Sequence, residues 1–199
     1  MSMSTPAAAR KARLLEEREA QIVAAARVLA EEQGWEAVTT RRLADAIGYS
    51  QPVLYGHFPE GRSQIVTAVA LLGFEELAAA LSAARPQPGG GAGGEDRARA
   101  LVVAYLDFAA RHPATYEAMF HLPIGAAFAS DETPRAMREG FDAITDALLA
   151  LDRPPSPRPT AAEVVWGAMH GVATLQRAGR FSAGNYERRV DELVRRVVG

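Results

Sequence analysis

Gln51, Tyr55 and His57 are the residues whose types and spacing best suit binding chemistry, because three hydrogen-bonding side chains fall within one short segment. Tyrosine and histidine two positions apart can both donate to phosphate oxygens as neutral groups, and glutamine can pair with adenine through two hydrogen bonds. A proline or valine beside them can pack on a thymine methyl group. If one helix presents these side chains together, the segment predicts contact with nucleic acid.

The surrounding sequence, Thr39 to Phe58, predicts the two short helices that would position them. Gly48 fits a tight turn, which requires a residue free of Cβ strain, and Ser50 stands where the second helix needs an N-cap. Two helices joined in this way form a helix-turn-helix. The apolar repeat of its first helix consists of Leu43, Ala44 and Ile47.

The second helix is expected to begin just after Ser50. Pro52 is tolerated in its first turn, and Leu54 and Phe58, four residues apart, are expected to face inward. The remaining side chains are then expected to point outward: Gln51, Val53, Tyr55 and His57.

An amphipathic helix is predicted before the motif, from about residue 16 to 33, with Gly34 as its stop signal. Trp35 and Val38 are expected to fill the core from the connecting loop. The apolar face of this helix consists of Ile22, Val23, Ala26, Leu29 and Ala30. Together with the two helices of the helix-turn-helix, it would close a small core.

This stretch of about fifty residues resembles the N-terminal DNA-binding domain of TetR-type transcriptional repressors, whose pattern runs Thr, Ile-Ala, Gly-Val-Ser and Leu-Tyr-x-His-Phe. The corresponding places here hold Thr39-Thr40, Leu43-Ala44, Gly48-Tyr49-Ser50 and Leu54-Tyr55-Gly56-His57-Phe58. The resemblance implies that Tyr55 and His57 hold the DNA backbone. One departure is that the family usually has a phosphate-binding lysine after His-Phe, where this chain has Gly61-Arg62.

Base reading is expected from Gln51, Pro52, Val53 and Tyr49, at the start of the second helix. For the residues expected at phosphates, the alternative is an ordinary solvated helix surface; these residues are Arg41, Arg42, Tyr55, His57 and Arg62. The arm Arg10-Lys11-Ala12-Arg13 can be interpreted equally as a minor-groove contact or as a solvated tail. The full set expected to contact double-stranded operator DNA is Thr40, Arg41, Arg42, Tyr49, Ser50, Gln51, Pro52, Val53, Tyr55, His57 and Arg62.

The charge of the chain is a weak objection to DNA binding. The formal net charge is −2, and residues 1–62 carry eight cations and eight anions. The cations gather in the arm and at the start of the helix-turn-helix, so the local field can be positive where phosphates would lie.

Composition narrows the remaining classes of protein. The 199 residues are 48% hydrophobic and can bury a good core, and the absence of cysteine excludes disulfides, Cys-based zinc sites and thiol nucleophiles. No leader or long apolar run suggests export or a membrane span, so a cytoplasmic protein without a membrane partner is expected. No metal-ligand spacing, nucleophile elbow or phosphate loop is found, so no catalytic residue, metal or cofactor is expected.

The rest of the chain predicts an all-α architecture in two domains: a helix-turn-helix domain over 14–62 and a helical ligand-binding and dimerisation domain over 63–199. The glycine- and proline-rich segment at about 85–94 is expected to be a flexible loop. Thr160 is expected to cap one helix through a capping box. Helices are predicted at about 63–84, 95–111, a short one to 121, 133–151, 161–178 and 186–198.

Within the helix after Thr160, Trp166-Gly-Ala-Met-His170-Gly171 resembles the C-terminal domain of a TetR-type subgroup named after its Trp, His and Gly signature. A small-molecule effector is expected to bind in this domain, and the alternative for the same residues is ordinary core packing. The candidate ligand-binding residues are Tyr105, Phe108, Phe120, His121, Phe128, Trp166, Met169 and His170.

A homodimer is expected, because one recognition helix covers only a few base pairs. The last two helices are expected to form the contact, through Val164, Val165, Ala168, Val172, Leu175, Val190, Leu193, Val194 and Val197. The expected function is a ligand-responsive repressor on a pseudo-palindromic operator. Alternatives are a helical enzyme, a helical protein-interaction adaptor, or a small-molecule-binding protein that does not bind DNA.

Overall fold

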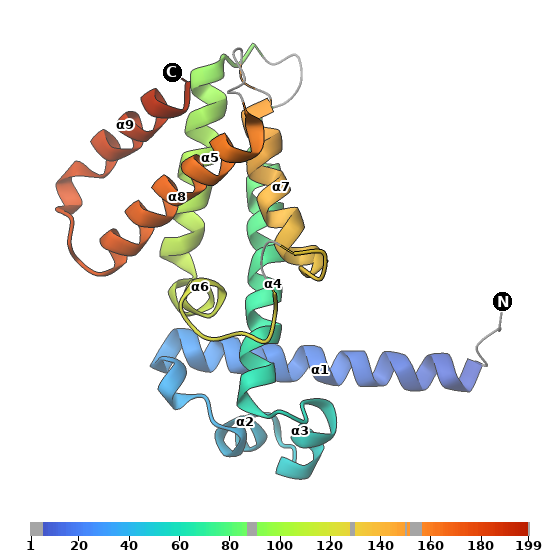
Figure 1. The fold of residues 1–199 in the computed structure, drawn as a ribbon. Coiled ribbons are helices and arrows are strands. Elements are labelled where there is room, and N and C mark those ends of the chain that lie inside the picture. Colours follow the sequence, from blue (N-terminus) through green and yellow to red (C-terminus); the bar gives the residue numbers. More distant parts are fainter. Residues whose placement is uncertain (1–5, 87–90, 128–129, 150, 152–156, 199) are drawn as a thin grey trace. The chain divides into compact units, whose positions relative to one another are not determined.

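The computed structural model describes residues 6–86, 91–127, 130–149, 151 and 157–198. Over these residues the chain forms nine α-helices and two short 3-10 helices without a β-strand, so the predicted all-α fold is confirmed (Figure 1). Contacts divide the chain into two compact units, Met1–Leu71 with Ala114–Ala126 and Leu72–Pro113 with Ala127–Gly199. The division differs from the domains expected from sequence, since residues 114–126 group with the N-terminal helices.

The first unit contains the helix-turn-helix. Its buried side chains come from every helix that the sequence placed there, including Ile22, Trp35, Val38, Leu54 and Phe58. The small core predicted for the three N-terminal helices is therefore confirmed. Its elements are α1 (Pro6–Gln33), η1 (Trp35–Ala37), α2 (Thr40–Ile47), α3 (Gln51–His57), the first part of α4 (Arg62–Ala83) and α6 (Pro113–Phe120) apart from Pro113 itself.

Helix α1 is longer than predicted, because it begins at Pro6 and not near residue 16. The arm Arg10-Lys11-Ala12-Arg13 is therefore the exposed N-terminal part of a helix and not an irregular tail. The sequence held a signal for this start, since proline is favoured in the first turn of a helix and the alanines that follow are strong helix formers.

Trp35 fixes the other end of α1 to α6. The indole is buried, and its Nε1 donates a 2.8 Å hydrogen bond to the carbonyl oxygen of Ala114. The loop after Gly34, which takes a left-handed φ of 80°, is thereby pinned to the first turn of α6.

The second unit is a helical bundle. Its elements, besides the rest of α4, are α5 (Gly94–Arg111), α7 (Arg135–Leu149), α8 (Arg158–Arg177), η2 (Ala183–Asn185) and α9 (Tyr186–Val198). Residues 87–90 of the predicted loop lie outside the described residues, and α5 already begins at Gly94. The expected cap at Thr160 is wrong: α8 begins at Arg158 with Pro157 in the N-cap position, so Thr160 lies inside the helix.

Helix α4 is long and apolar enough to cross a membrane by length and composition alone, with a mean hydropathy of 1.7. The core helix of a folded domain satisfies the same criterion, and α4 supplies buried side chains along its length. These are Ile65, Val66, Val69, Ala70, Phe74, Leu77 and Leu81.

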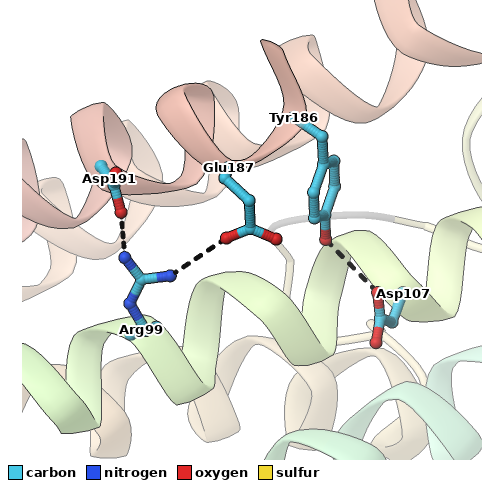
Figure 2. Close-up of polar contacts among 5 residues, drawn as sticks. All are labelled: Arg99, Asp107, Tyr186, Glu187 and Asp191. Carbon is cyan, nitrogen blue, oxygen red and sulfur yellow. Dashed lines mark hydrogen bonds and ion pairs between the residues drawn. The ribbon is translucent and has the colours of Figure 1, made fainter. Parts of the chain in front are cut away.

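Helices α5 and α9 are joined by polar contacts (Figure 2). The Arg99 guanidinium of α5 lies between two carboxylates of α9, 3.5 Å from Glu187 Oε2 and paired with Asp191. Two turns further along α5, Asp107 Oδ1 accepts a 3.3 Å hydrogen bond from the hydroxyl of Tyr186, the first residue of α9. Desolvation, reinforced by the Asp107 carboxylate, raises the pKa of Tyr186 above its usual value.

Candidate nucleic-acid interface

The helix-turn-helix has the predicted turn geometry. Gly48 ends α2 in the left-handed conformation, with φ 70° and ψ 27°, where a side chain would be strained. Thr39 caps α2, and its Oγ1 accepts a hydrogen bond from the Arg42 backbone N–H at 3.2 Å. Ser50 occupies the N-cap position of α3 in extended conformation, but its side chain makes no capping hydrogen bond, so its hydroxyl stays exposed beside the helix start.

Helix α3 buries one face and presents the other. Leu54 and Phe58 are buried as predicted, whereas Val53 is 36% exposed and Tyr55 47% exposed. Gln51 and Pro52 are exposed at the N-terminal end of the same helix. An amide, apolar groups and a phenol thus lie together on the outer face, and this combination can contact base edges and phosphates.

The start of α2 carries two arginines with different surroundings. Arg41 is exposed, while Arg42 Nη2 donates a 2.6 Å hydrogen bond to Gln33 Oε1 of α1. Thr40 is half-buried. The first backbone N–H groups of a helix also favour anions. A phosphate at this end of α2 would therefore be stabilised both by these N–H groups and by the Arg41 guanidinium.

His57 does not point outward, contrary to the sequence-based expectation. Its side chain is only 6% exposed, and its Nδ1 lies 3.3 Å from Glu19 Oε1 of α1. The last turn of α3 packs against α1, and the imidazole fills that contact. Tyr49 is held in a similar way, since its hydroxyl donates a 2.7 Å hydrogen bond to Gln21 Oε1.

Arg62 does not take the role expected of a phosphate-binding lysine. Its Nε donates to the Val38 carbonyl oxygen at 3.0 Å, and its Nη2 donates to the Trp35 carbonyl oxygen at 2.9 Å. The guanidinium therefore closes the loop around η1, because two of its donors are committed to backbone oxygens.

Sequence reasoning missed the α1 residues that orient the motif, Glu19, Gln21 and Gln33. Each is an ordinary polar residue on a helix rich in polar residues. Their partners lie 38, 28 and 9 residues away in the chain, so no local pattern marks them.

The candidate ligand-binding residues fall into both units. In the second unit, Tyr105, Phe108 and Met169 are buried. Trp166 Nε1 donates a 3.0 Å hydrogen bond to the Tyr105 hydroxyl, and the Trp166 ring lies edge-on to Phe141 with centroids 6.2 Å apart. The pair Trp166 and Tyr105 thus forms a partly buried polar contact among aromatic rings.

His170, one turn after Trp166, has its Nε2 3.5 Å from Thr174 Oγ1. Phe120 and His121 belong to the first unit, where His121 is exposed. Phe128 lies outside the described residues. No group of three or more potential metal-ligating side chains occurs among the residues that the structure describes.

The residues expected at the dimer contact divide between an exposed and a buried set. On α8, Val164 is 67% exposed, Leu175 is 43% exposed and Ala168 is exposed, with Val165 and Val172 intermediate. The α9 residues are instead buried within the chain, where α9 packs against α5. These buried residues, which cannot form an exposed seam in this structure, are Val190, Leu193, Val194 and Val197.

Comparison with known proteins agrees with this architecture. Residues 22–69 match the family model for bacterial regulatory proteins of the tetR family. Residues 98–199, just over half of the chain, match the model for a tetracyclin repressor-like C-terminal domain.

Similar individual proteins include an uncharacterized HTH-type transcriptional regulator of Mycobacterium tuberculosis, 28% identical over 86% of this chain and 74% of the relative. A solved structure of the regulatory protein SCO4313 has a TM-score of 0.69 at 25% identity, over 94% of this chain and 98% of that one. A TetR variant from Acinetobacter baumannii AYE, in complex with minocycline, shares the fold, with a TM-score of 0.63 at 16% identity over 89% of this chain and 92% of that one. The chain belongs to the TetR family of bacterial DNA-binding transcriptional regulators.

Proposed function

We propose that this regulator is a cytoplasmic homodimer that represses transcription from a pseudo-palindromic operator and is released by a small molecule. The observation that carries the proposal is the outer face of α3, where Gln51, Pro52, Val53 and Tyr55 are exposed while Leu54 and Phe58 anchor the helix. A short helix fixed in this way fits the major groove of DNA.

The side chains of the motif have separate roles in this proposal. Gln51 and Val53 read base edges, and Arg41 and Tyr55 bind phosphates. His57 acts as a positioning residue, because its buried imidazole contacts Glu19 and sets how α3 lies against α1.

The surface of α8 is the observation that supports the proposal of a homodimer. Its exposed face carries a continuous stripe of small and apolar residues at spacings of three and four. An ideal Cβ built at Gly167 or Gly171 meets no atom within 4 Å, so the backbone there is open to close approach. A second α8 packed on this stripe would bury apolar surface that a single chain leaves in water. The stripe consists of Val164, Gly167, Ala168, Gly171, Val172 and Leu175.

The effector proposed for the second unit is a largely apolar or aromatic small molecule that binds near Trp166 and His170. The aromatic rings around the Trp166–Tyr105 hydrogen bond support this chemistry, and a protein of the same fold holds minocycline. Binding would favour a conformation whose recognition helices are wrongly spaced for successive major grooves.

A thermal-shift screen of wild type and His170→Ala, combined with an operator-release assay, tests the effector site. An effector of the proposed class should act less potently on His170→Ala while the unliganded proteins melt at similar temperatures. Identical potency on both proteins would move the effector site away from His170.

Selection of bound sequences from a random DNA duplex library tests the function itself, since it requires no knowledge of the operator. The expected product is an inverted repeat whose half-sites are separated by about one helical turn. Failure to enrich any sequence would favour the alternatives, an adaptor or a small-molecule-binding protein that does not bind DNA.

A further inference from the structure

The N-terminal extension of α1, defined here as Pro6–Arg18, continues beyond the core of the first unit (Figure 1). Residues 7–21 are all exposed, and Ile22 is the first buried residue of the helix. Glu19 and Gln21, which follow the extension, contact His57 and Tyr49 of the helix-turn-helix. At 1.5 Å per residue, the extension reaches about 20 Å past Glu19.

The extension is helical through its own composition. Alanine, the strongest helix former, occupies positions 7, 8, 9 and 12. Arg13 Nε and Glu17 Oε1, four residues apart on one side of the helix, form an exposed ion pair at 2.9 Å. The helix therefore presents its side chains in a fixed register without tertiary support.

The charge of the extension is positive although the whole chain is negative. The extension, residues 6–18, contains four cations, Arg10, Lys11, Arg13 and Arg18, and two anions, Glu16 and Glu17, so its net formal charge is +2. Arg18 follows one turn before Ile22. The net formal charge of the whole chain is −2, so cations are concentrated at this end of α1.

The register of α1 separates these cations by face. Lys11, Leu15, Arg18 and Ile22 follow one another at spacings of four, three and four residues, so they lie on one face of the helix. Ile22 on that face is fully buried in the core of the helix-turn-helix unit. Lys11 and Arg18 therefore lie on the side of α1 that faces the helix-turn-helix. Arg13 lies about 200° around the helix from Lys11 and is paired with Glu17.

We propose that the N-terminal extension is a second phosphate-binding element, which contacts the backbone of duplex DNA outside the half-site that α3 reads. Lys11 and Arg18 make the contacts, whereas Arg10, about 100° from Lys11 and about 60° from Arg13, lies off this face. Lys11 lies eight residues before Glu19, about 12 Å along the helix axis, which corresponds to about three to four base pairs of B-DNA. The extension thus lengthens the operator footprint without reading its sequence. This inference rests on the proposed function.

Titration on two duplexes tests the inference. The short duplex ends at the outer edges of the selected half-sites, and the long duplex carries eight further base pairs on each side. Wild type should bind the long duplex at least several-fold more tightly, with a steeper dependence of affinity on salt. Lys11→Gln combined with Arg18→Gln should remove most of this difference and lower the salt slope on the long duplex by about 0.9 for each phosphate that is no longer neutralised.

Arg13→Gln compared with Lys11→Gln is the matched control, because both remove one cation from the same helix, two residues apart. Arg13→Gln should leave the gain from the long duplex nearly unchanged, while Lys11→Gln should reduce it. Circular dichroism and light scattering should show the same helicity and mass in every variant.

Three results would overturn the inference: equal binding of wild type to both duplexes, an equal decrease of affinity for both duplexes in the double variant, or a changed mass. The last would indicate that the extension joins copies of the chain. Failure of the proposed function would look different, since wild type would then bind neither duplex specifically.

Discussion

Glu31 and Thr115 are joined by two hydrogen bonds, although 84 residues separate them in the chain. Glu31 Oε1 accepts from the Thr115 backbone N–H at 2.9 Å and from its hydroxyl at 2.8 Å. The other carboxylate oxygen accepts from the Ala114 N–H at 2.9 Å. A carboxylate of α1 thus caps the N-terminus of α6, where the helix dipole also favours negative charge.

Glu31→Ala should lower the free energy of unfolding by about 1–3 kcal/mol, because it leaves donors of the buried Thr115 unsatisfied. Urea denaturation measures the decrease. Glu32→Ala is the matched control, since Glu32 is exposed and its removal should cost no more than about 0.5 kcal/mol. Equal effects of the two variants would remove Glu31 as the cap of α6.

Arg62→Met should destabilise the protein, because it removes the donors to the Val38 and Trp35 carbonyl oxygens. The expected cost is about 1–3 kcal/mol. Arg41→Met, which removes an exposed guanidinium, should instead weaken DNA binding with little effect on stability. Denaturation measures the stability of both variants, and anisotropy titrations measure their affinity for DNA. If Arg62→Met kept its stability but bound DNA more weakly, Arg62 would be a phosphate contact, as the sequence predicted.

Ionisation of Tyr186 should lower the free energy of unfolding at high pH. Its pKa is raised in the folded protein by desolvation and by Asp107, so folding favours the neutral phenol. The stabilisation is fully present below the unfolded pKa of about 10 and is lost as the pH rises through the folded pKa. Denaturation midpoints between pH 8 and 11 should decline less steeply in Tyr186→Phe than in wild type. Parallel pH profiles would contradict this assignment.

Leu175→Arg should break the dimer and leave the fold of the chain intact, because Leu175 belongs to the exposed stripe of α8. Leu193→Arg should instead unfold the second unit, since Leu193 is buried between helices of one chain. Light scattering and circular dichroism check both outcomes. A folded dimer of Leu175→Arg would move the interface away from this stripe.

The parts of the fold that could be predicted from sequence depend on neighbours in the chain. Gly48, Leu54 and Phe58 follow from turn chemistry and from helical spacing, and the structure confirms all three. A repeat of four residues places Leu54 and Phe58 on one face whatever the rest of the fold does.

The parts that could not be predicted depend on distant partners. The sequence of α3 alone predicts that His57 points outward. Its partner Glu19 lies 38 residues earlier in the chain, so the contact is visible only in the structure. Arg62 similarly finds its acceptors 24 and 27 residues away. For α9, helical spacing correctly grouped the apolar residues on one face, but only the packing of α5 shows that the face is already covered.

The most direct measurement of the proposed function compares wild type, Gln51→Ala and Tyr55→Phe on the selected operator and on a scrambled duplex. Gln51→Ala should narrow the ratio of the two affinities, reducing discrimination by about 1–3 kcal/mol through its base contact. Tyr55→Phe should weaken binding to both duplexes alike, because a phosphate contact carries no sequence information. Unchanged affinities of both variants for both duplexes would contradict the assignment of the outer face of α3 to operator DNA.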